Sequence, residues 1–175
     1  ELILSKFLTI VLFAGISTLF VFVMSLFLGY GFSSYTEIGI VFSDLEYLLA
    51  YFVKLLGFFS FCLFLGVLIK RSAFALGSLF IWFIFEKISY GILKFNIYNK
   101  NPKVDDVYAF MPLESMSNLL VEPFTRLSSV KNLQEAVGEN SLKDYDVHLS
   151  SILIVLVWTA IFVYSSYIII KKRDL

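Results

Sequence analysis

Four long hydrophobic stretches, at residues 7–30, 47–69, 72–94 and 149–170, are separated by more polar segments. A bilayer core about 30 Å thick is crossed by roughly 20 residues of helix, at about 1.5 Å of rise per residue. Each stretch is long enough, and the first and last contain no charged residue. The pattern therefore predicts an all-α fold: a polytopic transmembrane helical bundle of four crossings, forming a single transmembrane domain over residues 1–175.

The polar segment between the third and fourth stretches, residues 95–148, is long for a loop and predicts a helical insertion. In the sequence MPLESMSNLL, Pro112 suits a helix start and Pro123 follows as a stop, which bounds a helix at about 111–121. Its apolar residues recur at helical spacing: Leu113, Met116 and Leu120. We expect this helix to lie on the membrane surface or to cap the bundle, with these residues facing the membrane or the crossings.

A second short helix is predicted in the same segment, over residues 129–137. Its apolar residues again share one helical face: Val130, Leu133 and Val137. The insertion is therefore expected to hold a pair of short amphipathic helices before the last crossing.

Six basic residues flank the crossings on the same side. They are Lys6, Lys70, Arg71, Lys171, Lys172 and Arg173. The connection 31–46 has no basic residue but three acidic ones, Glu37, Asp44 and Glu46. Because Lys and Arg near short loops are retained in the cytoplasm, we expect both chain ends inside and the segments 31–46 and 95–148 outside the inner (plasma) membrane of a bacterial cell.

Composition supports a membrane protein and narrows its function. The chain is 59% hydrophobic and 16% charged, against about half apolar and a quarter charged in soluble domains. Its 14 basic and 14 acidic residues cancel, so nothing favours nucleic acid as a partner. Cys62 is the single cysteine, which excludes a disulfide or a thiolate cluster within one chain.

Three charged residues lie well inside the middle two hydrophobic stretches, away from their ends: Lys54, Glu86 and Lys87. A charge near the bilayer centre costs about 3 kcal/mol on insertion scales, so such residues usually face the bundle interior and are paired. Lys54 and Glu86 lie at a similar depth, roughly 11 Å from the outer ends of two neighbouring crossings. Three interpretations stay open: a Lys54–Glu86 ion pair, lysines that extend outward to the interface, or a role in a substrate path.

Motifs for chemistry are missing from the chain. It has no glycine-rich phosphate loop, no HExxH and no GxSxG. His148 stands alone, and Asp144-Tyr145-Asp146 fits a solvated loop end better than a metal site. Ala73 and Gly77 fit ordinary helix packing as well as a close helix approach. We therefore expect neither enzymatic activity nor a metal or cofactor in this chain.

Four segments resemble the later half of permeases of type-2 ATP-binding cassette (ABC) exporters. They are ELILSKFLT, IKRSAFALG, MPLESMSNLLVEPF and YSSYIIIKKRDL. The resemblance implies a six-helix permease of which residues 1–175 form crossings three to six, with the main coupling helix before Glu1. The cytoplasmic edge positions in this chain would then be Lys6, Lys70 and Arg71. It also implies that the short outer helices match the family's external helical hairpin, over the translocation path.

The partners that the resemblance implies are a separate ABC ATPase, which binds ATP and Mg²⁺, a second permease subunit and the lipid bilayer. The function expected is ATP-driven export. The 20 Phe and 10 Tyr suit an amphipathic or apolar cargo, although lipid-facing helices are aromatic-rich too. The alternative is a non-transporting membrane protein, such as a scaffold, assembly or immunity subunit.

Overall fold

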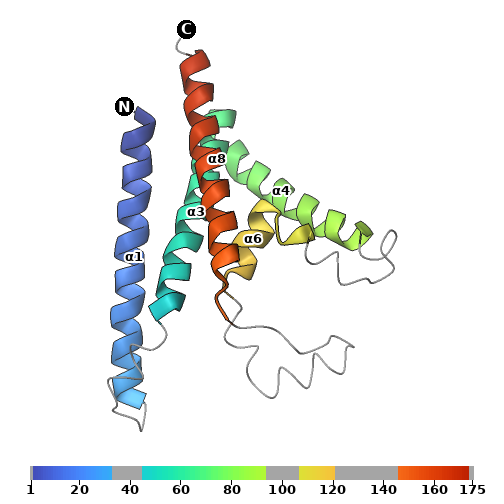
Figure 1. Cartoon of the computed structure of the whole chain (residues 1–175). Coiled ribbons are helices and arrows are strands. Elements are labelled where there is room, and N and C mark those ends of the chain that lie inside the picture. The colour runs from blue at the N-terminus through green and yellow to red at the C-terminus, as the bar shows by residue number, and fades with distance from the viewer. Residues whose placement is uncertain (1, 33–44, 94–106, 121–145, 174–175) are drawn as a thin grey trace.

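The structure is a computed structural model that describes residues 2–32, 45–93, 107–120 and 146–173. These residues form the helices α1 (Leu2–Phe32), α3 (Leu45–Ile69), α4 (Ser72–Ile92), α6 (Pro112–Asn118) and α8 (Leu149–Arg173) (Figure 1). Four of them, all except α6, are long and apolar enough to cross a membrane. The helical bundle with four crossings is thereby confirmed.

One end of the bundle collects the basic residues. The start of α1, the junction between α3 and α4, and the end of α8 lie together at this end, which we call the basic end (Figure 1). Lys6 is in the second turn of α1, Lys70 and Arg71 form the α3–α4 junction, and Lys171 and Lys172 are in the last turn of α8. The charge asymmetry in the sequence thus coincides with one end of the folded bundle.

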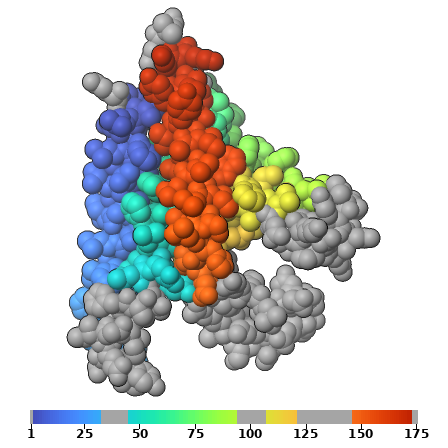
Figure 2. All heavy atoms as spheres, in the orientation of Figure 1, coloured from blue at the N-terminus to red at the C-terminus, as the bar shows by residue number. Residues whose placement is uncertain are grey.

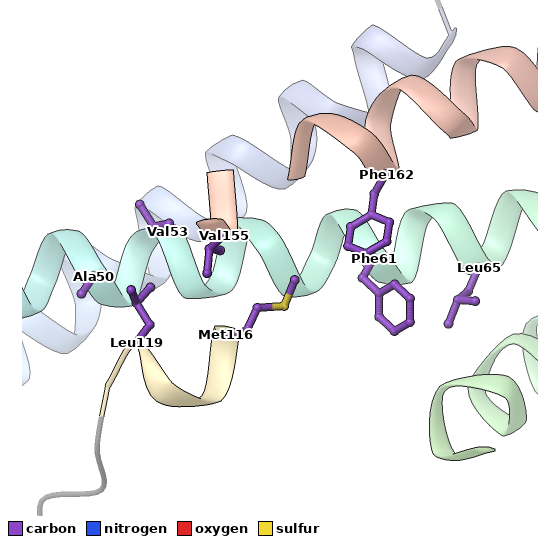
Figure 3. Close-up of a cluster of buried hydrophobic side chains, with 8 residues drawn as sticks. All are labelled: Ala50, Val53, Phe61, Leu65, Met116, Leu119, Val155 and Phe162. Atoms are coloured by element: carbon purple, nitrogen blue, oxygen red, sulfur yellow. The ribbon is translucent and has the colours of Figure 1, made fainter. Parts of the chain in front are cut away.

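Helix α3 is the centre of the bundle and packs against α1, α4, α6 and α8. The buried hydrophobic cluster takes four residues from α3, two from the α6 region and two from α8 (Figure 3). They are Ala50, Val53, Phe61, Leu65, Met116, Leu119, Val155 and Phe162. Helix α1, by contrast, buries only Ile3 and Ala14. Most of its apolar side chains therefore face outward, as expected of a helix that contacts lipid.

Helix α4 leaves α3 at a tight turn and then diverges from it. Lys70 has φ 62°, a left-handed conformation that ends α3. From this turn, α4 runs away from α3 and α8, and α6 lies in the space that opens between them (Figures 1 and 2). Glu86 is the one buried residue of α4.

Helix α6 packs with its apolar residues toward the crossings, which is one of the placements expected from the sequence. Met111 precedes it and Pro112 is its first residue, close to the predicted start. Met116 packs against α3 and α8 and is 3% exposed, and Leu113 and Leu120 pack against the same cluster. The helix therefore lies between crossings, because its apolar face packs against α3 and α8. The predicted stop at Pro123 and the predicted helix 129–137 fall outside the described residues.

Candidate functional site

The carboxylate of Glu86 caps the first turn of α6. Its Oε1 accepts hydrogen bonds from the Trp82 Nε1–H at 2.7 Å and from the Leu113 backbone N–H at 3.3 Å. Its Oε2 accepts the Glu114 backbone N–H at 3.1 Å. A carboxylate at a helix N-terminus is stabilised by the unpaired N–H groups and by the helix dipole. Glu86 thus acts from another helix as an N-cap.

The backbone donors at the start of α6 are all accounted for. Pro112 has no N–H, the next two N–H groups go to Glu86, and the Ser115 N–H donates to the Met111 carbonyl at 2.7 Å. Met111 itself makes no side-chain cap bond. Since an unsatisfied backbone group at membrane depth costs several kcal/mol, the carboxylate is what permits a helix to begin here.

Lys87, the next residue of α4, pairs with an acid of α6. Its Nζ lies 2.7 Å from Oε2 of Glu114, and both side chains are partly exposed. Among the residues that the structure describes, it is the one salt bridge. Adjacent residues on a helix point about 100° apart, so Glu86 turns inward while Lys87 reaches the side of α6 that remains accessible.

Lys54 of α3 contacts the other end of α6. Its Nζ donates to the Ser117 carbonyl oxygen at 3.4 Å, a long contact. The last carbonyl groups of a helix have no partner within it, and a cation there is favourable. Glu86 therefore lies at the N-terminal end of α6 and Lys54 at its C-terminal end, and each charge is favourable where it lies.

Two further contacts hold α6 and the turn before it against α8 and α3. Trp158 of α8 donates its Nε1–H to the Phe110 carbonyl oxygen at 2.8 Å. Gly57 of α3 is buried beneath Met116 and Val155: a Cβ at this position would lie 2.8 Å from Val155 Cγ1 and 3.1 Å from Met116 Cε. The missing side chain thus lets α6 and α8 approach the middle of α3.

These contacts place α6 within the depth of the crossings. Glu86 lies six residues before the end of α4, and Lys54 lies nine residues after the start of α3. At about 1.5 Å per residue, these positions are roughly 9 Å and 14 Å from the helix ends. The α6 seat, which we define as Lys54, Trp82, Glu86, Lys87 and Trp158, is therefore a group of polar side chains within the length of the crossings, and Glu86 is its buried member.

The expected Lys54–Glu86 ion pair is not formed in the structure. Glu86 binds Trp82 and the two α6 amides, and the ion pair among the described residues joins Lys87 to Glu114. The reason is that a third element separates the two side chains. Matching depth on neighbouring helices indicated that both charges face one space, but not that α6 occupies it.

Sequence reasoning missed the two tryptophans, Leu119 and Gly57. Trp82 stands four residues before Glu86, on the same helical face, and an indole N–H in an apolar helix needs an acceptor. That spacing could have identified Trp82. Gly77 is one of the two small residues considered for helix approach, but no atom lies within 4 Å of a Cβ added to it. The close contact is instead made at Gly57.

The remaining sequence candidates lie away from this seat. His148 precedes α8 and is exposed, and its backbone carbonyl accepts the N–H groups of Ser151 and Ile152. Asp144 and Tyr145 fall outside the described residues. Lys6, Lys70 and Arg71 are at the basic end, distant along their helices from α6.

An apolar groove of about 1020 Å³ lies between α1 and α8, toward the basic end. It is lined by the first turns of α1, by Leu56 of α3 and by α8 from Leu156 onward, and its polar members are Thr159, Tyr164, Tyr167 and Lys171. The apolar side chains that line the groove suit contact with lipid chains or with another apolar helix. The groove shares no residue with the α6 seat.

Comparison with protein-family models matches residues 1–175 to the model described as ABC-2 family transporter protein. Comparisons with curated proteins and with solved structures gave no match.

Proposed function

The chain belongs to the ABC-2 family of transporter proteins, and from this premise we propose that it is the membrane-spanning permease subunit of an ATP-driven exporter. The single observation that carries the proposal is the family match over residues 1–175. Four membrane-length helices support it, since a permease must build a path across the bilayer.

In this proposal, energy comes from a separate ABC ATPase that binds ATP and Mg²⁺ beneath the permease. Two permease subunits pack together, and closure of the ATPases moves the crossings so that cargo leaves outward. The apolar character of the helices suits an amphipathic or apolar cargo.

The proposed orientation places the basic end in the cytoplasm of a cell whose plasma membrane holds the protein. Lys and Arg at that end support this placement. The α6 seat then lies in the outer half of the membrane, between the crossings and the outer insertion.

Co-purification tests the proposal directly. The full-length protein, expressed with the ABC ATPase encoded nearest to it, is expected to purify as a complex and to support ATP hydrolysis in lipid vesicles. When the permease is omitted, the ATPase should no longer be recruited to the membrane fraction. A protein that binds no ATPase, and whose deletion leaves export unchanged, would favour the scaffold alternative.

Labelling tests the orientation. In a Cys62→Ser background, Glu46→Cys at the start of α3 should react in intact cells with a thiol reagent that does not cross membranes. Ser72→Cys at the start of α4 should react only after the cells are opened. The reverse pattern would show that the basic end faces outward.

A further inference from the structure

The two halves of α4 are attached to the bundle in different ways. Near the Lys70 turn, Ala75 and Leu79 pack against the hydrophobic cluster, and the Trp82 ring lies 5.9 Å from that of Phe61 on α3. The half beyond Trp82, residues 83–92, is the distal half of α4. Its Glu86 and Lys87 bind α6, and its Tyr90 ring contacts that of Tyr108, 5.1 Å away, just before α6.

Helix α6 in turn is attached to α3 and α8 chiefly by apolar contacts. Met116 and Leu119, each 3% exposed, lie in the cluster with Val53 and Val155 (Figure 3). Apolar contacts are non-directional and adapt to small shifts, whereas hydrogen bonds to a buried carboxylate fix a geometry. Lys54 of α3 makes one long contact with α6, at 3.4 Å, and Trp158 of α8 binds the turn before it. The hydrogen bonds that fix the first turn of α6 itself come from Glu86 of α4.

Glu86 is the strongest part of the link between α6 and α4. It is 3% exposed and accepts three hydrogen bonds, while the Lys87 side chain is 49% exposed and its ion pair is accessible to solvent and headgroups. Exposed ion pairs contribute little, and charged hydrogen bonds in buried surroundings contribute more.

We infer that Glu86 is a positioning residue: through α6, it fixes the distal half of α4 at its distance from α3 and α8. The separation of α4 from α3, and with it the width of the bundle at the end opposite the basic end, depends on this carboxylate. The consequence for export, a changed exit for cargo, rests on the proposed function. The effect on the helices does not.

Distances between spin labels in the full-length protein, in lipid nanodiscs, test the inference. In a Cys62→Ser background, one pair, Leu49→Cys with Ile92→Cys, reports the separation of α3 from the distal end of α4. A second pair, Leu49→Cys with Leu153→Cys, reports α3 against α8. All three positions are exposed. Labelled protein is diluted with unlabelled protein, so that only distances within one chain are measured.

Each pair is measured with Glu86, with Glu86→Gln and with Glu86→Ala. Glu46→Gln, an exposed acid at the start of α3, is the matched control. We expect the Leu49–Ile92 distribution to broaden and shift in Glu86→Gln, and further in Glu86→Ala, because Gln retains one acceptor oxygen. The Leu49–Leu153 distribution, and both distributions in Glu46→Gln, should stay unchanged.

Two results would overturn the inference. An unchanged Leu49–Ile92 distribution in both Glu86 variants would show that α4 holds its position without the carboxylate. A change in both pairs would show that Glu86 supports the whole bundle and does not position α4. Glu86→Gln keeps the side chain's size, so it decides the question if Glu86→Ala is not monodisperse. ATPase recruitment is measured on the same samples, and its absence with Glu86 intact would count against the proposed function alone.

Discussion

Gly57 shows how one missing side chain shapes the centre of the bundle. Val155 of α8 and Met116 of α6 both lie against it, at distances too short for an added methyl group. Val155 is β-branched and stiff, so it yields little, whereas the Met116 thioether can move aside. The contact between α3 and α8 therefore depends on glycine at this position.

The first prediction concerns Gly57→Ala. Adding a methyl group to a packed core costs about 1–3 kcal/mol, while replacing glycine within a helix gains roughly 0.5–1 kcal/mol. Gly66→Ala is the matched control on α3, since no atom lies within 4 Å of its added Cβ. In an SDS titration, Gly57→Ala should unfold more readily than Gly66→Ala. Equal stabilities of the two variants would show that α3 and α8 can move apart to admit the methyl group without a loss of stability.

At the scale of elements, the charges of Lys54 and Glu86 each contact α6 and do not contact one another. Glu86 faces its N–H groups and Lys54 faces its C-terminal carbonyl oxygen. This arrangement differs from a salt bridge in one testable respect. Exchanging the charges of a direct pair restores attraction, but exchanging them around α6 puts a cation beside N–H donors and an anion beside a carbonyl oxygen.

The second prediction is that the double variant Lys54→Glu/Glu86→Lys is no more stable than Glu86→Lys alone. Loss of the charged hydrogen bonds of Glu86 should lower the free energy of unfolding by about 1.5–3 kcal/mol. The double variant Lys87→Glu/Glu114→Lys is the control, since that pair is direct at 2.7 Å and should recover part of the loss of its single variants. Recovery in the Lys54–Glu86 exchange would instead support a direct ion pair.

At the scale of the whole molecule, the bundle relies on the bilayer to cover it. Helix α1 buries only Ile3 and Ala14, and it contacts α3 through Phe13, whose ring lies 5.3 Å from that of Phe59. Lipid tails are as apolar as these side chains, so helices associate in a membrane by close packing and not by hydrophobic exclusion from water. The attachment of α1 therefore depends on small residues at its contact.

The third prediction compares two neighbours on α1. Ala14→Leu should weaken the attachment of α1 and lower the free energy of unfolding by about 1–3 kcal/mol, because Ala14 is fully buried. Gly15→Leu, one residue along, should not lower it, because no atom lies within 4 Å of a Cβ there and replacing glycine within a helix gains roughly 0.5–1 kcal/mol. SDS titration of both variants measures the difference. Similar losses would show that α1 is held in another way.

The sequence by itself determined the four crossings and the start of α6. The crossings follow from bilayer thickness, which sets the length of an apolar run. They are helical because a helix pairs its backbone N–H and C=O groups within the segment, where hydrocarbon offers no other partner. Pro112 marked the first residue of α6 because its missing N–H is harmless there. The gathering of basic residues at one end followed from the same alternation of crossings.

Only the tertiary structure decided what the intramembrane charges contact. Lys54 and Glu86 are distant in sequence from α6, and each contacts one end of it because α4 diverges at Lys70 and α6 packs on Gly57 in the space between the helices. Depth along a helix can be counted from the sequence. The partner of a side chain cannot, because it depends on the angle between helices and on which element fills the gap, and both result from packing in three dimensions.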